Sequence, residues 1–149
     1  MMPPFRLTAQ QPSEMNEQIS LATWLDVRKI QYCHVPNGGK RDLITGARLK
    51  RSGVKKGVPD ILVFDRPPVY PGKVGTALEL KRRSAGTVSP EQREWLQALD
   101  ERGWIVAICK GWNEAVAFLE SAGYGKADST SGIARVRAVL GSSRLVNGE

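Results

Sequence analysis

The sequence predicts a single α/β domain in which a mixed β-sheet is flanked by helices. Stretches with apolar residues at helical spacing alternate with short apolar runs, in the order helix, strand, short helix, strand, strand, helix, strand, helix. The 149 residues suffice for one domain with a core but are few for two, and 41% hydrophobic and 25% charged residues are ordinary for a globular protein. We expect this domain over residues 13–123, with a flexible segment at 1–12 and a flexible or partly helical tail at 124–149.

The first three elements are predicted from the spacing of apolar residues and from residues that commonly begin or end helices and strands. Residues 13–30 have apolar residues at helical spacing, and Ser13 is a suitable N-cap. Residues 31–35 are predicted to form a strand, and residues 44–52 a short helix that ends at Gly53.

The next two elements are strands. Residues 61–64 are a continuous apolar run, which is typical of a strand covered on both faces. In residues 76–81, the side chains of Ala77, Glu79 and Lys81 share one side because alternate residues of a strand face the same way. The pleat therefore places the two charged groups together.

The last three elements have the clearest boundaries. Ser89-Pro90-Glu91-Gln92 combines a serine N-cap, a proline at the first helical position and a glutamine at the capping-box position. The helix that starts there should end at Gly103, and residues 104–109 read as a buried strand. A final helix is predicted over residues 114–121, ended by Gly123.

Two carboxylates and a lysine form the main chemical signal. Asp60 closes the run Gly57-Val58-Pro59-Asp60, and Glu79-Leu80-Lys81 follows about nineteen residues later, with strand-like sequence between them. Carboxylate oxygens at the ends of neighbouring strands are suited to a hard divalent cation, and a lysine on the same face can help to aim a water at phosphorus. These residues predict a metal site that cleaves a phosphodiester.

The positive charge is concentrated in one segment. Of the net charge of +7, residues 40–57 contribute +6, which leaves +1 for the rest of the chain. This segment has seven basic residues against Asp42 alone: Lys40, Arg41, Arg48, Lys50, Arg51, Lys55 and Lys56. A basic patch beside a carboxylate site suits a polyanionic substrate, and the alternative is a solvated basic helix without a partner.

Other classes of protein are disfavoured. No apolar run approaches the roughly 20 residues that a bilayer requires, and residues 1–12 lack the apolar core of a secretory signal. We expect a cytoplasmic location, no membrane association and no small-molecule cofactor. Cys33 and Cys109 are single and far apart, so we expect reduced, buried thiols rather than a zinc site or a disulfide.

Several motifs, taken together, resemble a stand-alone VRR-NUC domain, a branch of the PD-(D/E)XK nuclease superfamily. The resemblance covers approximately residues 13–122. It implies a restriction-endonuclease-like fold and cleavage of DNA with Mg²⁺ or Mn²⁺, often at Holliday junctions, flaps or other branches, by a homodimer. Small members of this kind are typical of bacteriophages, which implies the host cytoplasm as the location. The motifs are Pro36-Asn37-Gly38-Gly39-Lys40-Arg41, residues 49–60, Glu79-Leu80-Lys81-Arg82-Arg83, residues 89–95 and Gly111-Trp112-Asn113-Glu114-Ala115.

The resemblance also implies roles for individual residues. Asp60 and Glu79 would be metal ligands, with the Leu80 carbonyl as a third oxygen. Lys81 would orient or deprotonate the attacking water and stabilise negative charge in the transition state. Gln92 matches a glutamine that borders the active site, although a capping-box side chain that reaches back to Ser89 explains it equally well.

The first helix is expected to add a polar group to the site. Glu14 and Gln18 lie four residues apart on one face, and Glu17 lies on a neighbouring one. We favour Glu14, while a solvated helix face is the alternative for either acid. His34, the single histidine, is expected to be structural.

The basic segments are expected to contact the DNA backbone without reading its sequence. Asn37 has an alternative role in stabilising a glycine-rich turn. The predicted DNA-binding residues are Asn37, Lys40, Arg41, Lys50, Arg51, Lys55, Lys56, Arg82 and Arg83.

The functional prediction is a structure-selective endonuclease in replication, recombination or repair, because no base-reading module is evident. Two alternatives remain: a catalytically silent DNA-binding module on the same fold, and a sequence-specific, restriction-like endonuclease.

Overall fold

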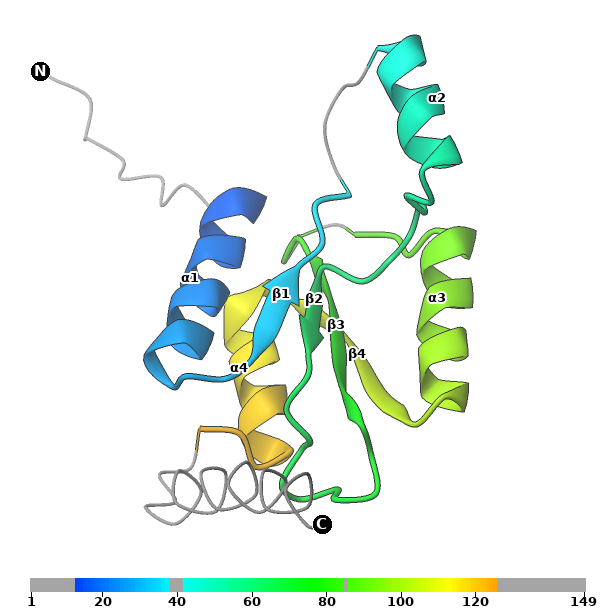
Figure 1. The fold of residues 1–149 in the computed structure, drawn as a ribbon. Coiled ribbons are helices and arrows are strands. Elements are labelled where there is room, and N and C mark those ends of the chain that lie inside the picture. The colour runs from blue at the N-terminus through cyan, green and yellow to red at the C-terminus, as the bar shows by residue number, and fades with distance from the viewer. Residues whose placement is uncertain (1–12, 38–41, 85, 126–149) are drawn as a thin grey trace, which may run out of the picture.

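The computed structural model describes residues 13–37, 42–84 and 86–125, and the elements within these ranges follow the predicted order. Residues 1–12 and 126–149, which carry the predicted N-terminal segment and most of the predicted tail, lie outside the described residues. The elements in Figure 1 are α1 (Glu14–Val27), β1 (Tyr32–His34), α2 (Leu43–Arg51), β2 (Ile61–Val63), β3 (Gly75–Lys81), α3 (Pro90–Glu101), β4 (Trp104–Lys110) and α4 (Gly111–Ser121).

The strands form one mixed sheet, as predicted, and their order in it is β1-β2-β3-β4. β2 pairs antiparallel with both β1 and β3, whereas β3 and β4 are parallel and are joined through α3. A parallel pair needs a crossover of this kind because its strands run in the same direction. Ile61 lies opposite Leu78, so Asp60, just before β2, is brought beside the end of β3.

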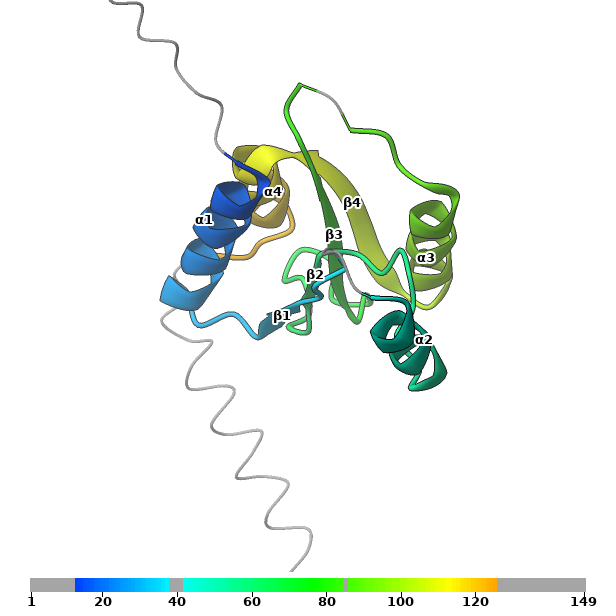
Figure 2. The same ribbon diagram turned by 90° about the horizontal axis from the view of Figure 1, so that it is seen from above.

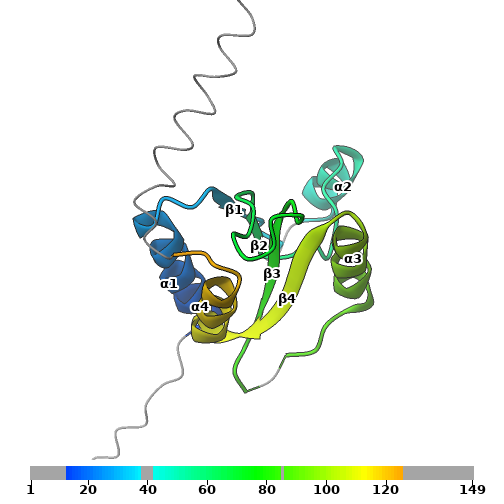
Figure 3. The ribbon, with the colours of Figure 1, turned by 90° about the horizontal axis from the view of Figure 1, so that it is seen from below.

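The helices cover the two faces of the sheet unequally. α1 and α4 lie together on one face, and α3 lies on the other, against β4 (Figures 2 and 3). The core is on the α1/α4 side, where Leu21 and Leu25 of α1 and Leu119 of α4 pack with Leu78 of β3, all fully buried. Because successive side chains of β3 point to opposite faces of the sheet, Glu79 points to the face on which α3 lies.

Local caps fix the starts of three helices. The Ser13 hydroxyl accepts the Asn16 N–H at 3.2 Å, and the Asp42 carboxylate accepts the Thr45 N–H at 2.8 Å. The Asp42 cap explains why α2 begins one residue before the predicted range. At α3 the full capping box between Ser89 and Gln92 is present, as predicted.

Two further predicted helix boundaries are wrong for identifiable reasons. α1 ends at Val27 instead of residue 30 because Lys29 adopts φ 55° and the N–H groups of Lys29 and Ile30 bond back to Asp26 and Leu25. This is a Schellman arrangement without its usual glycine, so the sequence gives no stop signal. α4 begins at Gly111 rather than Glu114, because its cap comes from another helix, as described below.

The core continues one residue past the predicted end of the domain at 123. Tyr124 is 3% exposed, and its hydroxyl lies 2.9 Å from the Thr76 hydroxyl and donates to the Asp65 carbonyl at 2.6 Å. Burial raises its pKa to about 12. Tyr124 therefore ties the end of the described chain to β3 and to the loop after β2.

The two cysteines are free, but only Cys109 is buried. The prediction of a buried Cys33 is wrong because β1 is an edge strand whose outward face is not covered. Burial raises the pKa of the Cys109 thiol to about 11, so it is un-ionised at neutral pH. Among the described residues, no helix is long and apolar enough to cross a membrane.

Candidate active site

Asp60 is held between two strands by its backbone and its side chain. Its carbonyl accepts the Val35 N–H at 2.8 Å and lies 2.8 Å from the Nδ1 atom of His34, both at the end of β1. Its Oδ2 accepts the Leu80 N–H at 2.8 Å. The carboxylate is thereby fixed against β3, between the positions of Glu79 and Lys81.

Glu79 and Lys81 lie on the same side of β3, as the strand pattern predicts. Glu79 is 2% exposed, and its Oε1 is 3.0 Å from the Lys81 Nζ. Gln92, from the first turn of α3, bridges both residues: its Nε2 donates to Glu79 Oε1 at 2.5 Å, and its Oε1 accepts the Lys81 ammonium at 2.9 Å. The end of β3 and the start of α3 are thus joined through three side chains.

Gln92 makes the contacts of the capping box and the contacts with Lys81 and Glu79 at the same time. Its Oε1, which accepts from Lys81, also accepts the Ser89 N–H at 2.9 Å, while the Gln92 N–H donates to the Ser89 hydroxyl at 3.2 Å. The capping-box reading and the site-bordering reading are therefore compatible. The cap holds the Gln92 side chain in place for its contacts with Lys81 and Glu79.

The two acids share a poorly solvated environment. Burial raises the pKa of Asp60 above its usual range, against the opposing effect of the Leu80 N–H. Burial, followed by the nearby charge of Asp60, raises the pKa of Glu79. The Glu79 Oε2 atom is buried and has no hydrogen-bond partner in the part of the chain that the structure describes.

These features fit a divalent cation. An orphaned buried carboxylate oxygen beside a second carboxylate is a site of unbalanced negative charge, and carboxylate and carbonyl oxygens are the ligands that Mg²⁺ and Mn²⁺ prefer. Within the described ranges, no three His, Cys, Asp or Glu side chains gather into a metal-binding group. Asp60 and Glu79 would therefore hold the ion together with backbone oxygen, such as the Leu80 carbonyl, and water.

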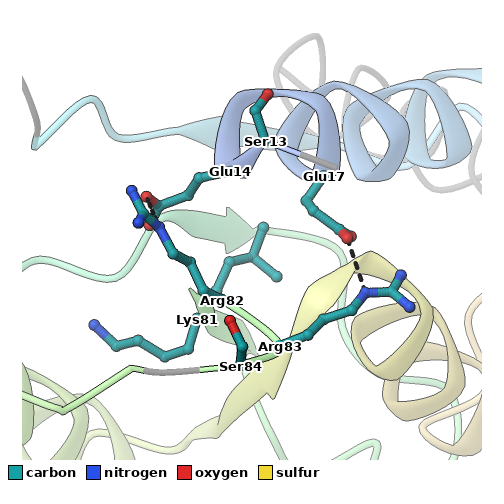
Figure 4. A pocket seen from close by; sticks show the side chains of 8 residues that line it. Ser13, Glu14, Glu17, Lys81, Arg82, Arg83 and Ser84 are labelled. Atoms are coloured by element: carbon teal, nitrogen blue, oxygen red, sulfur yellow. Dashed lines mark hydrogen bonds and ion pairs between the residues drawn. The ribbon is translucent and has the colours of Figure 1, made fainter. Parts of the chain in front are cut away.

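The acids of α1 separate into two environments (Figure 4). Glu14 is exposed, extends toward Arg82 with 3.4 Å between Oε2 and Nε, and lines the pocket that contains Asp60. Glu17 is buried and instead pairs with Arg83, with 2.9 Å between Oε1 and Nε. Of the two candidates that the sequence left open, Glu14 is the one whose pocket also contains Asp60.

Glu17 has a structural function at the start of α4. Its Oε2 accepts the Trp112 N–H at 2.6 Å, whereas the side chain of the N-cap residue, Lys110, makes no cap bond and Glu114 Oε2 accepts the N–H of Lys110 itself. Gly111 adopts φ 80°, and a Cβ there would lie 2.8 Å from Arg83 Nε. A carboxylate at a helix N-terminus is favoured by the exposed N–H groups and the helix dipole. Glu17 therefore supplies the missing cap and also fixes Arg83.

Two pockets meet at the Glu14–Arg82 pair. One, of about 340 Å³, lies between α1 and the residues that end and follow β3, and includes Glu17, Lys81 and Arg83 (Figure 4). The other, of about 590 Å³, lies on the β1 side and includes Gln18, His34 and Asp60. The sequence did not indicate His34 as a site residue and gave Gln18 only as sharing a helix face with Glu14, because their proximity to Asp60 arises from the pairing of β1 with β2 and from the packing of α1.

The predicted DNA-binding residues do not all form one surface. Lys50 and Arg51 lie in the last turn of α2, which has no buried residue and stands apart from the sheet (Figure 1). Lys55 and Lys56 are also exposed, and Lys56 Nζ is 3.6 Å from the Glu91 carboxylate. Arg82 is largely exposed, whereas Arg83 is partly occupied by Glu17. Lys40 and Arg41 lie outside the described residues.

Two backbone contacts connect the loop of residues 53–60 to the rest of the site. The Asn37 Nδ2 donates to the Val58 carbonyl, so Asn37 holds the loop that leads to Asp60. Gly57, in that loop, adopts φ 88°, and a Cβ on it would lie 2.7 Å from the Glu91 carbonyl carbon. Only glycine fits there, since both the conformation and the contact exclude a side chain. The loop that carries Lys55 and Lys56 is thus packed on the N-terminus of α3.

Helices on both faces of a mixed sheet, with two acids and a lysine at one end of its central strands, define a restriction-endonuclease-like α/β domain. The VRR-NUC domain family matches residues 13–113, more than half of the chain, and the chain therefore belongs to the VRR-NUC family of nuclease domains. A solved structure described as a VRR_NUC domain protein shares the fold, with a TM-score of 0.62 and 22% sequence identity over 75% of this chain and 88% of that one. No curated protein matches the chain significantly.

Proposed function

We propose that the protein is a metal-dependent endodeoxyribonuclease that cuts branched DNA during replication, recombination or repair. The observation that carries this proposal is the buried Glu79 carboxylate, whose Oε2 has no hydrogen-bond partner among the described residues while Asp60 and Lys81 lie beside it. Such a group is costly to the fold, and a divalent ion with a phosphate substrate accounts for it. Membership of the VRR-NUC family supports a nuclease.

Asp60, Glu79 and the Leu80 carbonyl are the residues that would hold Mg²⁺ or Mn²⁺. When bound, such an ion polarises the phosphate and lowers the pKa of water, which provides a nucleophile at neutral pH. The protein's own contribution begins with the placement of the two acids. The Leu80 N–H and the end of β1 fix Asp60, and Gln92 fixes Glu79.

Lys81 is proposed to act on the substrate. Its ammonium group faces the same space as the two carboxylates and is held there by Glu79 Oε1 and Gln92 Oε1. In this position it neutralises the charge that develops on the phosphate oxygens and orients the attacking water. Because its contacts exist before substrate arrives, little reorganisation is required during the reaction.

The basic residues are proposed to bind the arms of the DNA. Lys55 and Lys56 precede Gly57, which packs on α3, Lys50 and Arg51 end the exposed helix α2, and Arg82 lies on the α1 side of the site. Contacts from two sides suit a substrate whose strands diverge. They bind the backbone and carry no direct sequence information.

We also propose a homodimer, because a two-fold axis would place two sites on a symmetric junction. Light scattering of the free protein tests this directly, and a monomeric mass at all concentrations would contradict it. By the family resemblance, the protein acts in the cytoplasm, which is that of the host if a bacteriophage encodes it.

The function is tested with end-labelled linear duplex, flap and four-way DNA, each incubated with Mg²⁺, with Mn²⁺ and with chelator. We expect cleavage of the branched substrates in either metal and none in chelator. Binding without cleavage in every condition would favour the alternative of a catalytically silent DNA-binding module. Cleavage of linear duplex at one sequence would favour a restriction-like enzyme.

A further inference from the structure

The pocket of about 590 Å³ beside Asp60 has a lining that the proposed metal chemistry does not use. It lies between α1, the end of β1 and the start of β2, and its size is within the range of small-ligand sites. The pocket adjoins the proposed metal site, because Asp60 and Leu80 form part of its wall. The pocket is thus positioned to receive a nucleotide that neighbours the cut.

The charges of this pocket do not suit a phosphate group. Two of its side chains, Glu14 and Asp60, are acids, and its one Arg or Lys side chain, Arg82, is already paired with Glu14. Away from the ion that Asp60 is proposed to hold, a phosphate placed in this pocket would meet the Glu14 carboxylate and a cation that is already engaged. A neutral polar group is therefore the better occupant.

The remaining polar groups match the edge of a nucleobase. Gln18 lines the pocket, and its Nε2 is buried with no hydrogen-bond partner in the described ranges. A buried amide nitrogen of this kind requires an acceptor, and rotation of the Gln18 side chain toward the pocket would open the nitrogen to one. His34 bonds to the Asp60 carbonyl through Nδ1, and Asn37 bonds to the Val58 carbonyl through Nδ2, so both side chains are held in place at the rim. Amide side chains are the groups that commonly read base edges.

Apolar side chains provide the complementary surface. Met15, which is 65% exposed, lines the pocket together with Pro36 and Leu80. A flat base can pack on such groups while its edge bonds to Gln18, which is the usual combination in pockets for extruded bases. Met15 also gains a function, since a methionine this exposed does not contribute to the core.

We propose that this pocket binds the base of an unpaired nucleotide next to the scissile phosphate. A paired base is stacked within the duplex and cannot enter, so occupancy requires a strand that is already single or splayed at a branch. This inference rests on the proposed function and gives it a physical basis: selectivity for branched DNA would follow from a base-binding pocket rather than from the basic surface alone.

The inference is tested by binding in chelator, where no cleavage occurs. The probe is forked DNA with 2-aminopurine placed in turn at each unpaired position near the branch point. We expect one position whose emission rises on binding wild-type protein, because the base leaves the stack for a pocket without phenylalanine, tyrosine or tryptophan. Gln18→Ala should abolish this rise, while Gln97→Ala, a matched change on the exposed side of α3, should retain it.

A second measurement replaces the same nucleotide by an abasic site. Wild-type affinity should fall about tenfold, the size of one good base contact, whereas Gln18→Ala should bind both DNAs equally. Gln18→Glu keeps the size of the side chain and removes the amide donor, so it replaces Gln18→Ala if that variant does not fold. An abasic penalty that is unchanged by either variant, or constant emission at every position, would overturn the inference.

The two proposals fail in different ways. Absence of cleavage with every DNA and metal, with the fluorescence response intact, would remove the nuclease function and leave the base pocket. Cleavage of forked DNA that is indifferent to the abasic site would remove the pocket and leave the nuclease.

Discussion

The two buried acids, Asp60 and Glu79, are the residues that are hardest to explain by a contribution to the stability of the fold. Asp60 and Glu79 both have raised pKa values, chiefly through burial, and each lies close to the charge of the other or of Lys81. A protein selected only for stability would replace such a pair by apolar or amide side chains, because unbalanced buried charge is costly. The cost is accepted where the acids perform chemistry.

This cost predicts a dependence of stability on pH. An acid with a raised pKa binds its proton more tightly in the folded chain, so the free energy of unfolding falls as pH rises from the ordinary carboxyl range through the folded-state pKa. Asp60→Asn removes one such group and keeps an oxygen for the Leu80 N–H. In chelator at neutral pH the variant should be more stable than wild type, and the gain should shrink as pH falls.

Urea denaturation between about pH 4 and pH 8 measures this difference. Asp100→Asn, on the exposed end of α3, is the matched control and should show no comparable gain. Added Mg²⁺ should stabilise wild type and leave Asp60→Asn unchanged, since only an intact site binds it. A gain that is constant across pH would show that charge is not its cause.

Lys81 gives the second prediction at this scale. Lys81→Ala should reduce cleavage by about 10²–10³-fold, the usual effect of removing one group that stabilises transition-state charge. Binding of branched DNA in chelator should change little. Lys73→Ala, near the other end of β3, is the control and should cleave normally. Equal nicking by Lys81→Ala and wild type would refute the role given to this lysine.

At the scale of elements, the first turn of α3 serves as both a helix start and a wall of the site. Ser89→Ala removes the hydroxyl cap and should cost about 1 kcal/mol of stability, while cleavage persists because Gln92 still reaches Lys81. Gln92→Ala should have a similar cost in stability but also reduce cleavage, since Lys81 and Glu79 lose their bridge. Melting curves and rates for both variants test this, and parallel losses of activity would contradict it.

The start of α4 depends on α1 in a similar way. Glu17→Gln should lower the free energy of unfolding by about 1–3 kcal/mol, because charged hydrogen bonds to Arg83 and to the Trp112 N–H are weakened in a buried place. Glu14→Gln should cost well under about 1 kcal/mol, since its pair with Arg82 is exposed. Chemical denaturation distinguishes the two, and equal effects would contradict the assignment of Glu17 as the cap.

The sequence predicted those elements whose signals are local. The Ser89–Gln92 capping box and the alternation of Glu79 with Leu80 need no information beyond a few neighbouring residues, and both are confirmed. The start of α4 was missed because Glu17, its cap, is 95 residues from Trp112. The end of α1 was missed because Lys29, not glycine, adopts the left-handed conformation.

The same distinction applies to the candidate site. Asp60, Glu79, Lys81 and Gln92 were predicted from motifs and resemblance, and the structure brings them together. The sequence gave Gln18 only as sharing a helix face with Glu14, and His34 was expected to be structural. Their place beside Asp60 depends on strand pairing and on the packing of α1, which no short motif encodes.

For the whole molecule, the dominant feature is the uneven distribution of charge. The segment 40–57 contributes +6 of the net +7, and its described part, residues 42–57, comprises α2 and the loop that packs on α3. Replacing Lys55 and Lys56 together by Ala should weaken binding to all DNA sequences alike and reduce the salt dependence of affinity by up to about two phosphate contacts. Titrations at several salt concentrations test this, and a loss confined to one sequence would mean that the loop reads bases.

The close contact of Gly57 with α3 has a mechanical consequence for the molecule as a whole. Lys56 and Glu91 are 3.6 Å apart, and the Gly57 backbone rests on the same turn that carries Gln92. If Lys56 binds DNA as proposed, a phosphate would compete with Glu91 for it at the same turn that holds Gln92 against Lys81. DNA binding and the position of Lys81 would in this way be coupled through the contact between Gly57 and the first turn of α3.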